Sequence, residues 1–430
     1  MSQGELLFGY SEADITPEGP VTTVGFGRGD EMSRGVLHSL SAQIAVWRLG
    51  NDVCCLAAID HIGFSKKHSN ALRDGIGAAL GVPREKVMLC FSHTHAGPND
   101  SVEAAWFSAA RAKIERAAGT AHAAMGPVRA AWGNAAGDIG LNRRAESERL
   151  DKRIGILLLS DSETNAPRLL LLRLTAHANV LKADNYFISP DYFGAVRDTL
   201  GEKYGCPVMA TQGASGDVSP KYFRSRLTPP DAADARFVRA ETALSDMAQA
   251  VLNCAGPVID ALSPQKVRRL AMGSRTITLM ADVPDEARAL AVAREAQTLC
   301  GIDPAGWLFE VKRLNEAGIR AQREDVEAQF FRLGDGCLCG VPNEIMCDFS
   351  LRAAHILRDE FFYFGGYTNG CTGYFPTEAE FDKGGYEVYW SMLVYYIYFD
   401  RVFPLRRETA SELVDFVAKS APDFDARGMT

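Results

Sequence analysis

The chain has 430 residues, of which 47% are hydrophobic, and it carries a formal net charge of −8. This content is enough to bury a large core, and the length alone predicts two or three domain-sized units. The negative charge and the lack of a dense basic run exclude the electrostatic footprint of a protein that binds nucleic acid or an anionic membrane. We therefore expect a small-molecule substrate, no nucleic acid and no membrane as partners, while a homo-oligomer stays open.

The N-terminal stretch MSQGELLFGYSEADITPEGP contains acidic residues and has no cationic segment followed by an apolar one, so no signal peptide is predicted. No segment approaches the roughly 20 uninterrupted apolar residues of a membrane span. The ten cysteines lie in apolar runs such as DVCCLAAID and GCLCGVP, without a Cys-x-x-Cys pair. They are typical of reduced core residues, and we expect a cytoplasmic protein without a cysteine-based zinc site.

Strand-like and helix-like stretches alternate through the first 260 residues, which predicts an α/β fold with a mixed sheet core covered by helices. The predicted strands are 42–48, 53–59, 87–91, 128–132, 154–159, 169–175 and 208–211. The predicted helices are 67–80, 104–124, 191–204 and 234–252.

A long β-like stretch follows at 266–280, and two charged helical segments after it predict a small inserted helical lobe at about 280–322. The sheet pattern resumes at EAQFFRLGDGCLCGVP, where a Gly-Asp-Gly turn joins two apolar runs as in a hairpin. No polar, Pro-rich or Ser-rich spacer marks a boundary. We therefore expect one compact unit over 1–400 and a helical tail over 401–430.

Polar side chains follow the last hydrophobic residue of several predicted strands. The segment VMLCFSHTHAGPND places His93 and His95 after one strand, and two histidines at this spacing in an extended segment point to the same side. His177 follows LLLLRLTA, and Glu344 follows CLCGVPN. Loops at the carboxyl ends of strands commonly form a ligand crevice. Histidines and a carboxylate gathered there would suit a catalytic zinc site, which needs about three protein ligands and an open position.

Each of these residues also has a purely structural interpretation. The histidine pair could bond to nearby backbone, His177 could be a core histidine, and Glu344 could lie in the first turn of a helix, where a carboxylate suits the dipole. Asp60 and Asp217 are candidates for orienting a histidine ligand, or else turn and cap residues.

Five motifs in order, DITP, HTHAGP, GDVSP, GVPNE and GYFPTEAEFDKGGYE, resemble those of the neutral/alkaline non-lysosomal ceramidases, which are zinc-dependent amidases. The resemblance runs from about Gly9 to Tyr386 and so covers most of the chain. In that family, zinc is held by the first histidine of the His-Thr-His motif, a later lone histidine, a glutamate and a tyrosine. The matching positions in this chain are His93, His177, Glu344 and Tyr374.

The resemblance also implies roles for four further residues. His95 matches a residue beside the metal that shuttles a proton, while Arg143 in GLNRR and Tyr386 match active-site residues suited to stabilise an oxyanion. Ser219 matches the serine of the Gly-Asp-Val-Ser-Pro motif. Because the Gly-x-Ser-x-Gly elbow of a nucleophilic serine is lacking, we assign Ser219 to substrate binding or a supporting hydrogen bond.

The chain departs from the family in several places. Its long enzymes carry a C-terminal β-sandwich, whereas only about 45 residues follow Tyr386 here, so that domain is expected to be missing. The family's Gly-Glu is Asn343-Glu344, and the asparagine after its Ser-Pro is Lys221.

Positive charges near the proposed site bear on the substrate. They are Lys182, Lys221, Arg224 and Arg226. Each could be a solvated surface charge, but together they suit a polar or anionic substrate better than a lipid.

The sequence therefore predicts a zinc-dependent hydrolase that uses a zinc-activated water on an amide, ester or lactone bond of a small polar substrate. Three alternatives stay open: a true ceramidase, a metal-free serine hydrolase using Ser219 with His95 and Asp217, and a non-catalytic binding protein on the same fold. Sensitivity to a chelator separates the zinc and serine mechanisms.

Overall fold

The computed structural model describes residues 4–144, 147–221 and 241–425. Its larger sheet has eight strands in the order β11-β10-β9-β7-β1-β3-β4-β5, and its smaller main sheet has four in the order β13-β14-β15-β17. In the larger sheet, β4 pairs parallel with β5 and β10 pairs parallel with β11, while the other pairs are antiparallel. The predicted α/β class with a mixed, helix-covered sheet is therefore confirmed.

The strands of the larger sheet are β1 (Leu7–Asp14), β3 (Ser41–Leu49), β4 (Asp52–Ile59), β5 (Val87–Phe91), β7 (Gly126–Ala136), β9 (Arg153–Asp161), β10 (Pro167–Leu174) and β11 (Val208–Gln212). Those of the smaller sheet are β13 (Leu270–Asp282), β14 (Ala321–Leu333), β15 (Gly336–Gly340) and β17 (Phe362–Gly365). Only β1 of the larger sheet was not predicted, because its sequence LFGYSEAD mixes apolar, small and acidic residues without a clean alternation.

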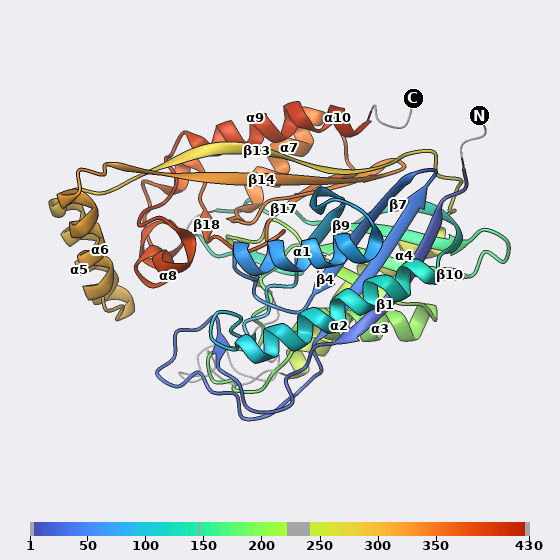
Figure 1. Ribbon diagram of the computed structural model, residues 1–430, viewed down its shortest axis with the longest axis horizontal. Helices are drawn as coiled ribbons and strands as arrows, with labels where there is room; N and C mark the ends of the chain where they lie inside the picture. The colour runs from blue at the N-terminus through green and yellow to red at the C-terminus, as the bar shows by residue number, and fades with distance from the viewer. Residues whose placement is uncertain (1–3, 145–146, 222–240, 426–430) are drawn as a thin grey trace.

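The two sheets pack face to face, and helices cover their outer faces (Figure 1). Side chains of β3 point alternately to the two faces of the larger sheet. Ile44 and Val46 join the core under the helices, while Ala45 and Trp47 join the core between the sheets. The helices over the larger sheet are α1 (Lys66–Leu80), α2 (Ala104–Ala123), α3 (Tyr192–Tyr204) and α4 (Glu241–Ala261). Those over the smaller sheet are α7 (Cys347–Leu357), α9 (Thr409–Ser420) and α10 (Pro422–Asp425).

Two predicted helices are found as α5 (Glu286–Cys300) and α6 (Ala305–Glu316), between β13 and β14. These two long strands pair in register over their whole length, so the helices lie at the far end of a hairpin (Figure 1). They pack against α8 (Ser391–Phe399) and the turn before it. The Gly-Asp-Gly turn joins β14 to β15 as predicted, while the boundaries at 400 and at 280–322 stay predictions.

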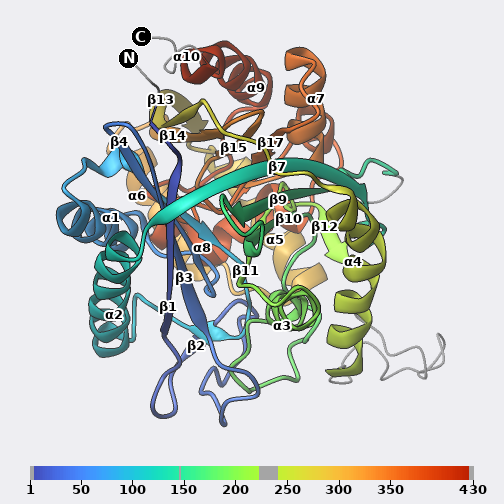
Figure 2. The ribbon, with the colours of Figure 1, turned by 90° about the vertical axis from the view of Figure 1, so that its right-hand side faces the viewer.

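The larger sheet bends sharply between its two halves, which brings its edge strands together. β1 and β7 pair over only two residue pairs, and β7 crosses β1 steeply in Figure 2. At the opposite edges, the Gln212 Nε2 at the end of β11 donates a hydrogen bond to the carbonyl of Ser92, the residue after β5, at 3.1 Å. The carboxyl ends of the two parallel pairs therefore meet in one place.

None of the described helices has the length and apolar content needed to cross a membrane.

Close packing of β1 against α2 gives a stability prediction at Gly9. A methyl group there would lie 1.8 Å from the carbonyl oxygen of Ala121 in α2, so the helix must move away from the sheet. We expect Gly9→Ala to lower the free energy of unfolding by about 1–3 kcal/mol, the usual cost of overpacking, as measured by urea denaturation. Gly19→Ala is the matched control, because nothing lies within 4 Å of its added methyl. Equal urea midpoints for the two variants would contradict this packing argument.

Candidate metal centre and active site

His93 and His95 leave the end of β5 in a constrained loop. The backbone of His93 has a φ of 62°, a left-handed conformation that is uncommon for a bulky residue and is held by surrounding contacts. Its N–H donates to the carbonyl of His61 at 2.9 Å, and the Thr94 hydroxyl donates to the carbonyl of Ser189 at 2.7 Å. These bonds turn both imidazoles toward the place where the strand ends meet.

Backbone carbonyls orient all three histidines of the site. The Nδ1 of His93 lies 2.6 Å from the carbonyl oxygen of Ile62, and the Nδ1 of His95 lies 3.0 Å from that of Gly25. The Nδ1 of His177 lies 2.7 Å from the carbonyl oxygen of Ser215. Because a carbonyl can only accept, each Nδ1 must carry the proton, which leaves the lone pair on Nε2.

These lone pairs converge with a carboxylate. One ring nitrogen from each of His93, His95 and His177 lies within 4.8 Å of the other two. The Oε2 of Glu344 lies 3.2 Å from the Nε2 of His93 and 3.3 Å from that of His177. The Nε2 atoms of His95 and His177 are buried and have no hydrogen-bond partner. Lone pairs facing a carboxylate repel each other unless a cation lies between them, so this donor set fits a metal ion, and nitrogen with carboxylate oxygen suits zinc.

The surroundings keep His95 and His177 neutral and Glu344 charged. Burial, assisted by the positive charge of Arg143, lowers the pKa of His177 to about 3. Burial and the neighbouring histidines lower the pKa of His95 well below its usual value. Burial alone would raise the pKa of Glu344, but the contacts with His93 and His177 hold it well below its usual value. A metal site needs these charge states, because only a neutral imidazole can coordinate.

Tyr374 lies beside Glu344 because the two residues pair across a short parallel ladder. The ladder joins β16 (Glu344–Ile345) to β18 (Tyr374–Phe375). The Tyr374 ring stacks on that of His177, and its hydroxyl accepts a hydrogen bond from the Nη2 of Arg143 at 3.0 Å. Burial raises the pKa of Tyr374 well above its usual value. The predicted fourth ligand therefore lies at the centre, between Arg143 and the ring of His177.

A cavity of about 290 Å³ opens onto this centre. Six of the eight predicted site residues line it: His93, His95, Arg143, Glu344, Tyr374 and Tyr386. The lining includes four further aromatic side chains, those of Phe26, Tyr395, Tyr398 and Phe399. It also includes polar side chains, those of Ser65, Asn99, Asp100, Ser101 and Asn179. His177 is fully buried beneath the cavity, where only its Nε2 faces the other ligand atoms.

Ser219 lies on β12 (Val218–Pro220) and is not among the residues that line the cavity. Its motif contributes backbone instead: the carbonyl of Gly216 accepts a hydrogen bond from the Nη2 of Arg143 at 2.6 Å, and that of Val218 accepts one from the N–H of His177. A substrate contact by the Ser219 hydroxyl therefore has no support in this geometry.

The prediction that Asp60 or Asp217 orients a histidine is wrong, since carbonyls do so. Asp60 forms a bidentate ion pair with Arg197 and accepts from the N–H of Ser41. Asp217 accepts hydrogen bonds from the N–H of Cys347 at the start of α7 and from the Nδ2 of Asn142. Both carboxylates therefore have a structural role, in which they tie together segments that are distant in the sequence.

The basic side chains expected around the cavity do not line it where they are described. Lys221 forms an ion pair with Asp138, and the Lys182 Nζ lies near the Asn179 Oδ1. Arg224 and Arg226 lie outside the described residues. Among the described lysines and arginines, Arg143 lines the cavity, and it is paired with Glu387.

Three residues of the site were missed by the sequence analysis. The Tyr367 hydroxyl lies 3.4 Å from the Oε2 of Glu344, and the Cys371 Sγ lies 3.8 Å from its Oε1. Glu387 contacts Arg143. A tyrosine and a cysteine in the glycine-rich stretch GGYTNGCTG carry no spacing signal, but Glu387 directly follows the predicted Tyr386 and could have been considered with it.

Comparisons with known proteins give a fold. No protein-family model matches the chain, and no curated protein matches it. Solved structures do match: the neutral ceramidase from Pseudomonas aeruginosa has a TM-score of 0.67 and 17% sequence identity, covering 94% of this chain and 75% of that one. A ceramidase complexed with C2 has a TM-score of 0.66 and 17% identity, covering 94% and 76%. The chain therefore has a neutral-ceramidase-like fold, as the motifs implied.

Proposed function

We propose that this protein is a zinc-dependent hydrolase that cleaves an amide, ester or lactone bond of a small polar substrate. The observation that carries this proposal is the meeting of buried Nε2 lone pairs with the Glu344 carboxylate at the end of a cavity. The likeness in fold to solved ceramidase structures supports the hydrolase class.

His93, His177 and Glu344 would hold the metal, with Tyr374 as a fourth ligand or a close neighbour. When bound, zinc supplies a Lewis acid that polarises a carbonyl and lowers the pKa of water to about 7. The neutral state of His177 and the charged state of Glu344 meet the requirements of such ligands.

The remaining polar groups of the cavity would handle protons and developing charge. His95 lines the cavity, and its Nδ1–H donates to the Gly25 carbonyl while its Nε2 has no hydrogen-bond partner. The Nε2 can therefore accept a proton and deliver it to the leaving group. Arg143 and the Tyr386 hydroxyl line the same cavity and are donors for an oxyanion.

The size and wall of the cavity support a small substrate. A volume of about 290 Å³ lies at the lower end of the range for ligand pockets, which is little room for a two-tailed lipid. The polar lining residues, among them Asp100, suit hydroxyl or amide groups of a substrate, and the aromatic lining residues suit an apolar part. Neither Lys182 nor Lys221 lines the cavity, so among the described residues these two lysines do not favour an anionic substrate.

The alternatives rank lower on the same geometry. A serine hydrolase using Ser219 would need that hydroxyl beside the substrate, but Ser219 does not line the cavity. The solved structures of similar fold are ceramidases, which keeps a ceramidase activity as an alternative. A non-catalytic binding protein would bind the metal but show no turnover. The experiments below separate these cases.

The first prediction concerns metal content. We expect the purified protein to contain about one zinc per chain, and His177→Ala to lose it because a ligand nitrogen is removed. Elemental analysis measures this, with His355→Ala on the exposed face of α7 as the control that keeps its zinc. Glu344→Gln should also lose zinc. Because it preserves the side-chain volume, it separates loss of a ligand from misfolding of His177→Ala. Full zinc in both site variants would refute the ligand assignment.

The second prediction separates His95 from the ligands. Because His93, His177 and Glu344 already supply three donors, His95→Ala should keep most of its zinc while its turnover rate falls roughly 10²- to 10⁴-fold, the scale of general acid/base catalysis. Zinc content and kcat are measured on the same preparation. Loss of zinc together with activity would instead make His95 a ligand, in line with the three-histidine cluster.

The third prediction concerns the substrate. On a panel of small polar amides, esters and lactones beside a long-chain ceramide, we expect turnover of a small substrate and its loss on chelation. Competition assays measure kcat/KM for each compound. Cleavage of ceramide above about 10⁴ M⁻¹s⁻¹, the low end of ordinary enzyme efficiency, with no small compound cleaved, would establish the lipid alternative. Chelator-resistant turnover would favour the serine mechanism.

A further inference from the structure

We propose that Glu387 is a positioning residue that fixes the guanidinium of Arg143 beside the candidate metal centre. This inference rests on the proposed hydrolase and assigns part of its machinery to a side chain outside the predicted set. Glu387 lies on the π-helical turn Tyr386–Trp390, one residue after Tyr386. Its carboxylate lies 2.9 Å from the Nε of Arg143.

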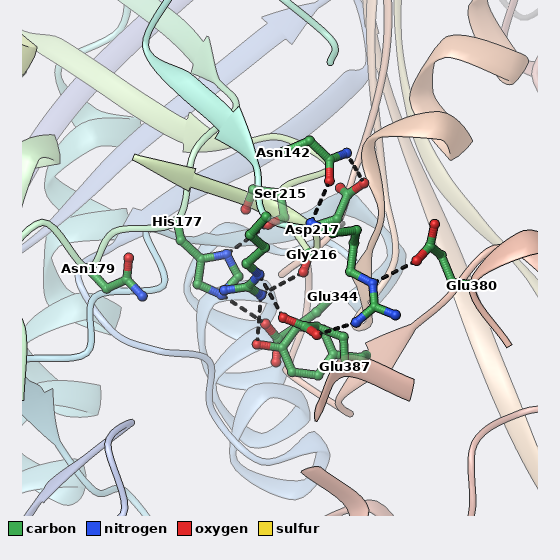
Figure 3. A network of polar contacts seen from close by, with 12 residues as sticks. Asn142, His177, Asn179, Ser215, Gly216, Asp217, Glu344, Glu380 and Glu387 are labelled. Carbon is green, nitrogen blue, oxygen red and sulfur yellow. Dashed lines mark hydrogen bonds and ion pairs between the residues drawn. The ribbon is translucent and has the colours of Figure 1, made fainter. Parts of the chain in front are cut away.

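The contacts of Arg143 leave it little freedom. Its Nη2 donates to the Gly216 carbonyl at 2.6 Å and to the Tyr374 hydroxyl at 3.0 Å, while the Glu387 Oε1 faces its Nε as an ion pair. The guanidinium is a planar fork, so a partner on each side sets its plane as well as its place. Figure 3 shows Gly216, Glu387 and Glu380 within this network of polar contacts, whose dashed lines mark hydrogen bonds and ion pairs.

Charge gives a second reason for Glu387 to be there. Arg143 lies beside Tyr374, a candidate ligand of a divalent cation, and two positive centres at short range repel each other in a site shielded from water. The carboxylate of Glu387 has only 12% of its side chain exposed, so it offsets the charge of Arg143 with little solvent screening. Without it, the guanidinium is expected to turn away from the metal side.

Arg144 provides an internal comparison. Its Nη1 contacts the other oxygen of Glu387 at 2.8 Å, and its Nε contacts Glu380 at 2.6 Å. Glu380 is as buried as Glu387, with 9% of its side chain exposed, but it forms its ion pairs with Arg144 and Lys383. Replacing Glu380 therefore disturbs the same ion-pair network without touching Arg143.

The test compares Glu387→Gln with the matched control Glu380→Gln in the full chain. We expect Glu387→Gln to lower kcat about 10- to 100-fold with little change in KM or zinc content, less than the 10²- to 10³-fold loss on removing an oxyanion donor outright. Glu380→Gln should stay within about threefold of the wild type. Glu387→Asp, which keeps the charge, should recover part of kcat, and adding Glu387→Gln to Arg143→Gln should cost no further rate.

Binding of benzoate gives a readout that does not depend on turnover. Benzoate is a product-like carboxylate whose ring suits the aromatic lining residues, and a positioned Arg143 should bind its oxygens. By isothermal titration calorimetry on the protein as purified, Glu387→Gln and Arg143→Gln should weaken benzoate binding at least fivefold, and Glu380→Gln should not.

The outcomes distinguish this inference from the proposed function. A wild type without zinc and without turnover would reject the hydrolase, and the benzoate series alone would then decide the role of Glu387. An active wild type whose Glu387→Gln and Glu380→Gln variants share the same kcat would overturn the positioning role while leaving the hydrolase intact. Equal benzoate affinity in all variants would overturn it as well.

Discussion

The candidate site depends on one constraint. Its candidate ligand atoms face one another without a proton between them, and they therefore repel each other. Three imidazoles donate hydrogen bonds from Nδ1–H to backbone carbonyls. The lone pairs on the Nε2 of His93 and of His177 therefore face the Glu344 carboxylate at 3.2 and 3.3 Å. In a buried place this arrangement costs free energy unless a cation is shared. The fold must therefore hold these atoms together against their own electrostatics.

The bent sheet provides that restraint. Its halves join at two residue pairs, and its edge strands meet again where Gln212 bonds to Ser92, so the loops after β5 and β11 are fastened to each other. Glu344 follows β15 of the second sheet and is fixed to Tyr374 by the short β16–β18 ladder. The candidate ligands thus come from separate parts of the molecule, each anchored by main-chain bonds.

The sequence predicted seven of the eight strands of the larger sheet and most of the candidate site. Apolar runs are typical of buried strands, and the polar residues His93, His177 and Glu344 that follow such runs indicated where the strands end. It did not predict the orienting carbonyls, since a backbone oxygen has no residue signature. The ion pair of Lys221 was missed for a related reason, because its partner Asp138 lies 83 positions away in the sequence.

Because backbone carbonyls orient the histidines, few side chains of the site need to be of a particular type. Ile62 and Ser215 hold a histidine through the main chain, so their side chains are free to differ without changing the tautomer. Gly25 is the exception, because its φ is +130° and an added methyl would lie 2.7 Å from the Nδ1 of His95. The site therefore restricts the residue type at a few candidate ligand positions and at Gly25. Elsewhere it depends on the path of the backbone, which is compatible with a fold shared at 17% identity.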